Sequence, residues 1–547
     1  MDEVKIDLLS IISETPENET IRVGPGLIEL PDKTKFVKSI QIIFEENTKV
    51  ICNSLEILGS TVTFTNMNYD GYIKTLQSNI QFNNCRFTNE KSKVEYIIDA
   101  DFQSIISCSK STFENISHYT LLTQNLSSIY CIDTDFKNCK LAVINNNFKA
   151  DFIGCKFINT EEYFIFNHDS SLCVINNCLF DTSTLTSILN LGTMTVQKST
   201  FKNSSDTQIS CYSESSLYVI DCIYENSKQT ALFINDSKLN VHNCQFRNID
   251  GNCINILNCV GTISSSTFEN STYPHISMAI VSDIEIFDCT FKNSPSSCVM
   301  CRGGSVLAIN NCTFDGTKRF GLATCDGTIQ ECSNCVFNSC QHACVASFDN
   351  GTFNISNSKI NGPTEVAIEV FCGGKLSGSN LQVAKAEIAS VRTRFGASIN
   401  LTDSFLEKGS NLVLDGLNTH IKNVENTNDV ELENTKKDPI PRCFKCGKDC
   451  SQNLFDACGH ACYCRECCPP KGACPLCHLD YESAILPHPM STDKLCGICM
   501  ENEADSILIP CGHLICQKCF LEWYKHESGC PYCRHKFVNC RSLVPYA

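Results

Sequence analysis

Residues 496–533 contain seven cysteines and His513 at spacings that suit metal binding. In chain order these residues follow the pattern C-x2-C-x11-C-x-H-x2-C-x2-C-x10-C-x2-C. The two thiolates of a C-x2-C pair can bind one zinc ion at about 2.3 Å, and an imidazole nitrogen can bind it at about 2.0 Å. Four such ligands close a tetrahedral site and leave no position for a reacting water. The pattern therefore predicts zinc that stabilises a small module rather than zinc that catalyses hydrolysis.

The order of these eight residues resembles the RING finger family. The resemblance implies two interleaved sites, in which the first and third ligand pairs share one zinc ion and the second and fourth pairs share the other. One site would be formed by Cys496, Cys499, Cys516 and Cys519, and the other by Cys511, His513, Cys530 and Cys533. Disulfides or unliganded thiols are the competing interpretation.

The resemblance also implies a docking groove for a ubiquitin-conjugating enzyme. In active RING fingers the groove is formed by an apolar residue before the second ligand, a Trp after the sixth and a Pro after the seventh. These positions are occupied here by Ile498, Trp523 and Pro531. The resemblance therefore implies a RING-type ubiquitin ligase with ubiquitin and its conjugating enzyme as partners.

Arg534 directly follows the last ligand, where RING ligases often carry a cation that bonds both the conjugating enzyme and its ubiquitin. The planar fork of a guanidinium suits such a bridge better than the point charge of a lysine. A solvated surface arginine is the alternative. The implied enzyme is a transferase that orients a ubiquitin thioester and forms no covalent intermediate on its own chain.

A second set of ligand-type residues precedes the first, with a spacing that resembles the RING of the inhibitor of apoptosis proteins. By the same interleaving, two further zinc ions are expected, one on Cys443, Cys446, Cys464 and Cys467, and one on Cys458, His460, Cys474 and Cys477. The alternative is that Cys450, Cys462 or Cys468, which lie close in the sequence, replaces one of these ligands. Lys445 stands where the groove residue would be, and His478 stands where the bridging arginine would be. We therefore expect a structural, dimerising or partner-binding module rather than a second catalytic one.

A short phrase built around an aromatic residue recurs about every 23 residues in the long N-terminal part. From Phe87 to Ile360 a Cys, Ser or Thr stands two residues before the repeated position, and an Asn usually stands two residues after it. The period of two places the small and aromatic residues on one face of a strand, and stacked Asn amides can bond to each other at a turn. The aromatic positions are Phe64, Phe87, Phe113, Phe136, Phe157, Phe180, Phe201, Tyr224, Phe246, Phe268, Phe291, Phe314 and Phe337, with Ile360 and Phe405 in phase.

This repeat predicts a mainly β fold, a right-handed parallel β-helix whose coils stack at about 4.8 Å. The opening "TIRVGPGLIELPDKTKFVKSIQIIFEEN" strengthens the prediction, because it resembles the first coils of pectin-lyase-like β-helices. The cysteines of the repeat alternate with Ser and Thr at one position, as at Cys155, Ser199 and Thr134. We therefore expect them to be small buried fillers rather than metal ligands.

The sequence predicts six segments. Residues 1–18 form a cap with a short amphipathic helix, residues 19–423 the β-helix, and 424–442 a polar linker. Residues 443–480 form the first RING-like finger, 481–494 a second linker, and 495–547 the second RING with a C-terminal tail.

Composition limits the location and the partners. Residues 443–547 hold 10 Lys+Arg and 11 Asp+Glu, so nearly all of the net charge of −16 lies in residues 1–442. This acidic balance disfavours nucleic acid as a partner. Neither a secretory signal nor an apolar run of membrane length is visible, so we expect a cytoplasmic or nuclear protein with reduced cysteines. A protein substrate is expected on the β-helix, and the apolar tail that ends near Tyr546 could pair two copies into a homodimer.

Two other functions stay open. The zinc modules could hold partners without transferring ubiquitin, as a scaffold does. A carbohydrate-binding or carbohydrate-cleaving β-helix is the third interpretation, although the paired carboxylates of polygalacturonases are missing and the only tryptophan, Trp523, lies outside the repeats.

Overall fold

The computed structural model describes most of the repeat region and parts of the C-terminal modules. The described residues are 5–88, 96–362, 364–394, 396–415, 418–428, 430–433, 445–446, 454–455, 463–473, 480–481, 484–485, 495–502, 504, 506–509, 511–516, 519–520, 523, 529–534 and 539–542. Among these residues no helix is both long enough and apolar enough to span a bilayer.

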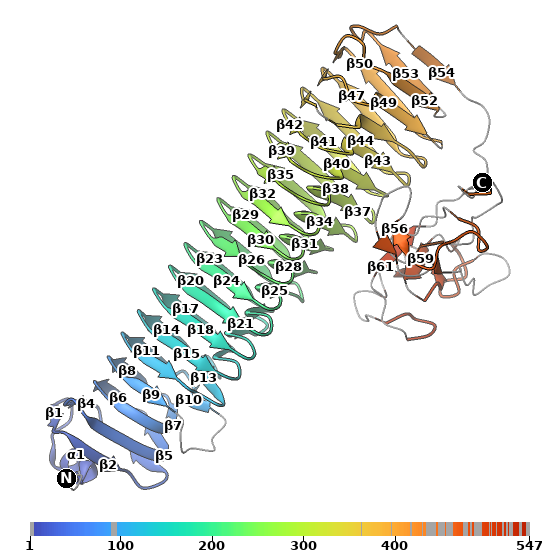
Figure 1. The fold of residues 1–547 in the computed structure, drawn as a ribbon. Coiled ribbons are helices and arrows are strands. Elements are labelled where there is room, and N and C mark those ends of the chain that lie inside the picture. The colour runs from blue at the N-terminus through green and yellow to red at the C-terminus, as the bar shows by residue number, and fades with distance from the viewer. Residues whose placement is uncertain are drawn as a thin grey trace.

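The repeats wind into a parallel β-helix that forms a long rod (Figure 1). One face of the rod, which we call sheet 1, is a 20-stranded sheet in the described part of the chain. Its strands are β1 (Thr20–Val23), β4 (Ile40–Phe44), β6 (Thr61–Thr65), β8 (Asn79–Asn83), β11 (Ile105–Ser109), β14 (Ser128–Ile132), β17 (Lys149–Ile153), β20 (Leu172–Asn176), β23 (Thr193–Gln197), β26 (Ser216–Ile220), β29 (Lys238–His242), β32 (Val260–Ser264), β35 (Asp283–Phe287), β38 (Val306–Asn310), β41 (Thr328–Ser333), β44 (Thr352–Ser356), β47 (Lys375–Ser379), β50 (Ser398–Thr402), β53 (Asn418–Lys422) and β54 (Val430–Glu433).

A second described sheet, of 34 strands, covers the other two faces. It is continuous because β5 (Thr48–Leu58) and β7 (Asn68–Leu76) run across both faces; β2 (Gly26–Glu29) and β3 (Thr34–Phe36) pair with β5. The face we call aromatic contains β9 (Arg86–Thr88), β12 (Thr112–Glu114), β15 (Asp135–Cys139), β18 (Lys156–Thr160), β21 (Leu179–Ser183), β24 (Thr200–Ser204), β27 (Ile223–Glu225), β30 (Gln245–Ile249), β33 (Thr267–Ser271), β36 (Thr290–Lys292), β39 (Thr313–Asp315), β42 (Val336–Asn338), β45 (Lys359–Ile360), β48 (Gln382–Val383) and β51 (Phe405–Leu406).

The remaining strands of this sheet form what we call the third face. They are β10 (Tyr96–Asp101), β13 (Tyr119–Thr123), β16 (Ile144–Asn146), β19 (Ile165–Asn167), β22 (Ile188–Asn190), β25 (Ile209–Cys211), β28 (Leu232–Asn235), β31 (Ile254–Leu257), β34 (Ile276–Ala279), β37 (Val299–Arg302), β40 (Phe320–Cys325), β43 (Ala343–Phe348), β46 (Val366–Val370), β49 (Ala389–Arg394) and β52 (Leu412–Asp415).

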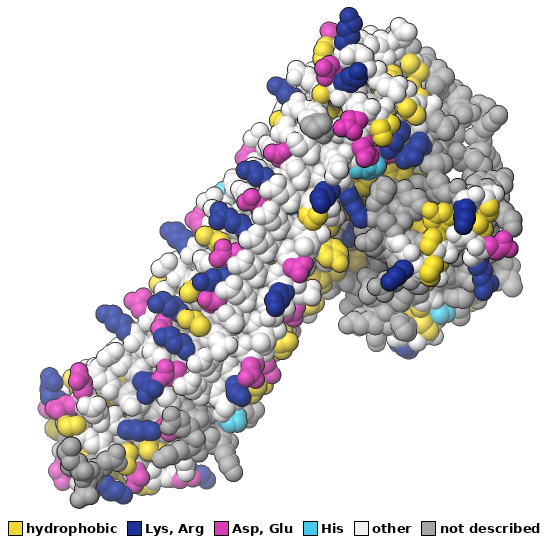
Figure 2. Space-filling model, in the orientation of Figure 1, with side chains coloured by type: hydrophobic (Ala, Val, Ile, Leu, Met, Phe, Trp, Pro, Cys, Tyr) yellow, Lys and Arg dark blue, Asp and Glu magenta, His cyan; other side chains and the backbone are white. Residues whose placement is uncertain are grey.

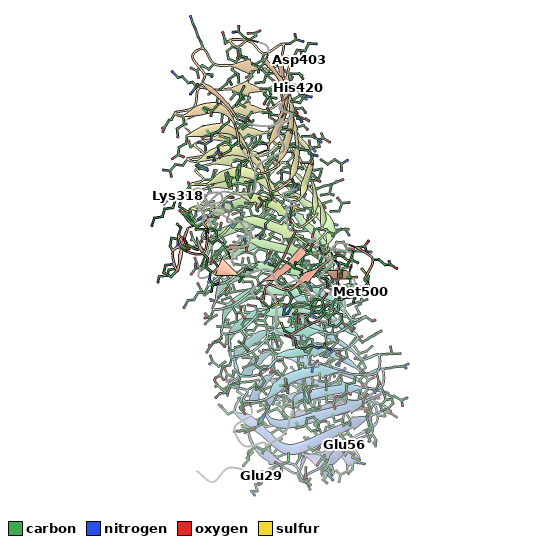
Figure 3. The ribbon with its side chains drawn as sticks, turned by 90° about the vertical axis from the view of Figure 1, so that its right-hand side faces the viewer. Glu29, Glu56, Lys318, Asp403, His420 and Met500 are labelled. Carbon is green, nitrogen blue, oxygen red and sulfur yellow. The ribbon has the colours of Figure 1, made fainter. Side chains whose placement is uncertain are left out.

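The described strands of the C-terminal modules are short. These are β55 (Leu454–Phe455), β56 (Gly472–Ala473), β57 (Asp480–Tyr481), β58 (Ala484–Ile485), β59 (Ser506–Ile509), β60 (Leu514–Ile515) and β61 (Asn539–Ser542). They lie beside the middle coils of the rod (Figures 1 and 3).

The predicted aromatic residues form one stack through the interior of the rod. From Phe87 to Phe337 neighbouring ring centroids lie 4.4–5.1 Å apart and the rings are nearly parallel. This distance matches the spacing of paired strands, about 4.8 Å. Coil stacking therefore places equivalent rings in van der Waals contact along the rod.

The prediction of the aromatic series is wrong at both of its ends, at Phe64 and at Phe405. Phe64 lies in sheet 1 and pairs with Phe82, whereas the residue that pairs with Phe87 is Tyr69. At the other end Phe405 pairs with Gln382 and is 42% exposed, and Leu406 continues the interior row. Strand faces alternate with every residue, so a shift of one position exchanges inside and outside.

The turns of the coils confirm two predictions from the repeat. Asn residues two positions after the aromatic residues adopt left-handed φ, and their amides bond between coils, as from Asn159 to Asn138 at 2.8 Å. The repeat cysteines are buried, and Cys155 and Cys178 lie close to carbonyls of the preceding coil. They are small fillers at the bends, and in the described residues they do not gather into a metal site.

Each end of the rod carries an additional element. Helix α1 (Leu8–Glu14) buries Leu8 and Ile12 against the first coil, and Asp7 caps its N-terminus by accepting a hydrogen bond from the Ser10 amide at 3.2 Å. At the other end β54 pairs antiparallel with β53. The segment predicted as a linker therefore contains an edge strand, because the last coil leaves backbone donors and acceptors that a further strand can pair.

Charged side chains of both signs alternate along the rod face that Figure 2 shows. Several pair between neighbouring coils, as Lys202 does with Asp181 at 3.3 Å and Lys35 with Glu56 at 3.4 Å. Exposed pairs of this kind contribute little to stability, about 0–1 kcal/mol each. The rod is therefore held by its interior and its backbone ladders rather than by its surface charges.

Tyr224 offers a test of the interior stack. Its hydroxyl is fully buried and, among the described residues, has no hydrogen-bond partner. Tyr224→Phe should therefore raise stability by about 1 kcal/mol, because it removes an unsatisfied polar group without changing the ring. Thermal unfolding followed by circular dichroism measures the change. The reverse variant in the next coil, Phe246→Tyr, should lower the melting temperature, and a lower melting temperature for Tyr224→Phe would contradict the structure.

Candidate metal centre

Two C-x2-C turns in the second module have the same backbone geometry. The amide of Met500 donates to the carbonyl of Cys496 at 2.9 Å, and the amide of Arg534 donates to the carbonyl of Cys530 at 2.8 Å. Met500 and Arg534 both adopt left-handed φ, 56° and 60°. Each turn therefore folds back on itself and presents its two thiols on one side.

A hairpin positions the second pair of ligands. Strands β59 and β60 pair antiparallel, and the turn between them contains Cys511 and His513. The turn is tight because Gly512 has a φ of 75° and donates to the carbonyl of Leu508 at 2.7 Å. Strand β61 adds to the other edge of β59, with Cys540 opposite Leu508.

The eight ligand-type residues gather into two groups. In each group the donor atoms lie within 4.8 Å of one another, and the groups are Cys496, Cys499, Cys516 and Cys519, and Cys511, His513, Cys530 and Cys533. These are the two interleaved sets predicted from the sequence. The groups enclose a shared apolar core that includes Ile507, Leu508, Ile515 and Phe520.

The chemistry and spacing of the donors fit zinc. The sulfurs of Cys499 and Cys516 are 3.8 Å apart. A tetrahedral ion with zinc–sulfur bonds of about 2.3 Å places its sulfurs about 3.8 Å apart, whereas a disulfide requires about 2.05 Å. Thiolates and one imidazole form a soft donor set that suits this ion.

Nearby backbone groups favour the thiolate that zinc requires. The amides of Asn502 and Glu501 lower the pKa of Cys499 to about 6. The Asn502 side chain also donates to the sulfurs of Cys499 at 3.5 Å and Cys516 at 4.0 Å. Burial acts in the opposite direction on Cys511 and raises its pKa to about 12. A cation that binds this second group must therefore displace the proton of Cys511, a thiol that resists ionisation.

The predicted groove residues lie around the two C-x2-C turns. Ile498 is 43% exposed on the first turn, and Pro531 is half-buried on the second. Met500, which sequence reasoning did not single out, is 62% exposed two residues from Ile498. The sequence position of Met500, directly after the second ligand, does not predict its exposure. The exposure depends on the left-handed turn that projects the side chain outward.

Trp523 and Arg534 contact each other. The indole Nε1 of Trp523 donates to the carbonyl of Gly529 at 2.8 Å, which fixes the ring beside the second C-x2-C turn. The Arg534 guanidinium then lies 5.5 Å from the centre of that ring. A cation–π contact of this kind contributes about 0.5–1 kcal/mol at exposed sites. The sequence identified both residues but not their contact.

The described part of the first module brings together Cys446, Cys464 and Cys467, with the sulfurs of Cys446 and Cys464 3.6 Å apart. These are three of the four residues predicted for one site, and Lys445 beside them is exposed. The other predicted ligands lie outside the described residues: Cys443, Cys458, His460, Cys474 and Cys477.

Trp523 provides a signal for metal removal, because it is the only tryptophan of the chain. Chelation of zinc should shift its fluorescence to longer wavelength as the indole loses Gly529 and enters water, while the circular dichroism of the rod stays constant. Each site should contribute on the order of 10 kcal/mol of apparent folding free energy. Cys530→Ser should show the shift without chelator. Cys540→Ser is the matched control, and the same shift in that variant would contradict the assignment.

Comparison with known proteins separates the same two regions. Residues 230–384 match the family described as right handed beta helix region. Residues 492–540 match the family described as zinc finger, C3HC4 type (RING finger).

Among curated proteins the matches are short. The E3 ubiquitin-protein ligase CBL-C of Homo sapiens is 47% identical over 57 residues, 10% of this chain and 12% of that protein. Peroxisome biogenesis factor 10 of Pichia angusta is 36% identical over 62 residues, 11% of this chain and 21% of that protein. The chain thus spans only 21% and 12% of the length of these two relatives.

Among solved structures the chain is similar to the Mannuronan C-5 epimerase AlgE6 A-module of Azotobacter vinelandii, at 9% identity over 75% of this chain and 90% of that chain, with a TM-score of 0.18. It is also similar to the PL6 family alginate lyase AlyGC, at 8% identity over 77% and 99%, with a TM-score of 0.30. Such scores carry no argument about activity. From the two family matches, the chain carries a right-handed β-helix region followed by a C3HC4 RING finger.

Proposed function

We propose that this protein is a RING-type ubiquitin ligase. The observation that carries the proposal is the pair of interleaved ligand groups with an exposed Ile498 on one turn and a Trp523-supported Arg534 on the other. The short match to the E3 ubiquitin-protein ligase CBL-C supports the same activity.

The two ligand groups of the second module would each hold one zinc ion. Closed tetrahedral coordination supplies structural stabilisation there and no reactive position. The first module would hold zinc on Cys446, Cys464 and Cys467 with Cys443, and a further ion on its remaining predicted ligands. Its exposed Lys445 replaces the apolar groove residue, which supports a structural or partner-binding role.

The proposed docking groove for the conjugating enzyme is formed by Ile498, Pro531 and Trp523. Ile498 supplies an exposed apolar side chain, Pro531 a half-buried ring and Trp523 a fixed indole, which are the components of a small hydrophobic site. Met500 extends it, because its side chain is also exposed on the same turn. Contacts of this kind exclude water around a few central residues, which carry most of the binding energy in protein interfaces.

Arg534 would bridge the conjugating enzyme and its ubiquitin. Its side chain is exposed, and the Trp523 ring restricts its motion. Less conformational entropy is then lost when the guanidinium forms paired hydrogen bonds with carbonyl groups of two partners. The proposed role is orientation and does not involve proton transfer.

The reaction would take place between the conjugating enzyme and the substrate. A neutral lysine amine of the substrate attacks the thioester carbonyl carbon, a C–N bond forms, and the C–S bond breaks. The sulfur leaves with the bonding electron pair as the cysteine thiolate of the conjugating enzyme, and the attacking nitrogen loses one proton to solvent. This chain contributes the fixed pose of the thioester, which raises the rate through orientation.

The rod would bind the protein substrate. Sheet 1 exposes apolar side chains in three consecutive coils: Ile132 on β14, Ile153 on β17, and Leu172 and Val174 on β20. The first two pair directly between coils. An exposed apolar surface with a polar rim is typical of a protein-binding site. We place the protein in the cytoplasm or nucleus, where its thiols would stay reduced.

Substitution of the groove tests the proposal. Ile498→Ala and Arg534→Ala should each abolish most ubiquitin-chain formation by the full chain with a matching conjugating enzyme, and Arg534→Lys should retain only part of it. Gel assays of chain formation measure the effect, with zinc content and the melting curve as folding controls. Ile388→Ala is the matched control, because Ile388 is 47% exposed on the rod. Unchanged activity in both alanine variants would refute the groove.

Discharge of thioester to free lysine separates a ligase from a scaffold. The zinc-loaded chain should accelerate discharge by at least one of a panel of ubiquitin-loaded conjugating enzymes. A chain that binds these enzymes but accelerates none of them would be a scaffold.

A further inference from the structure

The third face of the rod changes character along its length. In β16, β19 and β22 the central residue of each strand points outward and is half-buried. In β40, β43 and β46 every residue is buried. Residues on the outer side of these three strands are therefore covered by another part of the chain.

The covered surface is built from small and aromatic residues. Ala323 and Ala346 pair with each other on adjacent strands and face outward, because their neighbours Leu322 and Val345 belong to the interior core. Around them lie the buried rings of three phenylalanines, two of which stack at 4.8 Å. We call this surface the seat, and its residues are Phe320, Ala323, Ala346, Phe348 and Phe371.

The first zinc module occupies the seat. Phe455, on β55, is fully buried and belongs to the same apolar cluster as the seat residues. Tyr463 and Cys468 pack against that cluster, and the rings of Phe455 and Tyr463 meet edge to face at 6.2 Å. The two small side chains of the seat allow the aromatic residues of the module to approach the rod backbone closely.

A buried carboxylate forms one edge of the seat. Glu369 follows Ala346 in the same outward row and has no exposed surface. Its carboxylate accepts hydrogen bonds from Arg392 at 2.9 Å and Arg394 at 2.6 Å, and lies 3.2 Å from Nε2 of His342. A buried charge is costly unless it is paired in this way. The pairing lets a charged coil lie directly beside the apolar seat.

The same module also contacts the second RING. Tyr463 packs against both the seat cluster and the core of the RING, and Cys464, the next residue, belongs to that core. Among the described residues, Ile280 of the rod also packs directly against the RING core. The segment Tyr463–Cys468 therefore lies between the rod and the RING. It contains two of the three grouped thiols of the first module, Cys464 and Cys467.

We propose that the first zinc module is an intramolecular clamp that binds the seat on the rod and holds the second RING in a fixed position. Metal bound by Cys446, Cys464 and Cys467 would keep the Tyr463–Cys468 segment in the shape that fits between the two. The partner of this module is thus the chain's own β-helix. This inference does not depend on ligase activity.

The test asks whether the zinc modules stay bound to the rod after the chain between them is cleaved. A protease site is inserted within residues 434–442 of the full chain, the zinc-loaded protein is cleaved, and the fragments are separated by size-exclusion chromatography. The two fragments should elute together. They should separate after zinc removal by a chelator, since the Tyr463–Cys468 segment would lose its shape.

Substitutions on the seat give the decisive comparison. Ala346→Arg should separate the cleaved fragments, because the long charged side chain fills the space of the module. Met300→Arg should do the same more weakly; Met300 is half-buried and pairs with Ala323 in the same outward row. Leu189→Arg is the matched control, because Leu189 belongs to the same row in β22, several coils from the seat.

Circular dichroism of the rod and zinc content accompany each variant. If Ala346→Arg changes the circular dichroism of the rod, the elution of the cleaved Met300→Arg variant is compared with that of Leu189→Arg instead. Separate elution of the unmodified cleaved chain would overturn the clamp. Continued co-elution of both seat variants would overturn it as well.

Discussion

The rod depends on one distance, the spacing of about 4.8 Å between hydrogen-bonded strands. Flat rings in van der Waals contact need nearly the same separation, so a row of phenylalanines fits the coils without strain, with centroids 4.4–5.1 Å apart. An amide at the turn reaches its equivalent in the next coil, as Asn270 reaches Asn248 at 3.0 Å. Because each coil contacts mainly its neighbours, stability accumulates along the rod.

The zinc modules are stabilised differently from the rod, because their strands are too short to enclose a stacked apolar interior. The apolar core of the second RING contains few large side chains, and four of its buried members are cysteines. Ligand geometry therefore replaces hydrophobic volume as the main constraint. Once the two C-x2-C turns are fixed by their left-handed residues, Ile498 and Arg534 acquire defined positions as a by-product of metal-site geometry.

The contact between the rod and the first zinc module bears directly on the proposed mechanism. Under the proposed function, a rod that binds the substrate and a module that orients a thioester can act together only if the distance between them is controlled. The seat, which includes Ala323 and Ala346 and is bounded by the paired charge of Glu369, would fix that distance under the proposed clamp. Rigid attachment also reduces the conformational entropy lost when the substrate lysine and the thioester are brought together.

The sequence by itself determined the β-helix, the interior row of rings and both ligand groups of the second RING. These features are local, periodic or carried by a family resemblance: a residue's distance along the chain fixes its coil, a C-x2-C spacing brings two thiols together, and the resemblance to RING fingers implies which pairs share an ion. It failed at Phe64 and Phe405, because the first coils use long strands and the last lose the repeat phrase, so counting by 23 no longer tracks the strand face. Only the tertiary structure decided the contact of Arg534 with Trp523, the exposure of Met500 and the seat occupied by Phe455 and Tyr463. Those contacts join residues far apart in sequence or depend on how turns project side chains, and no local spacing encodes them.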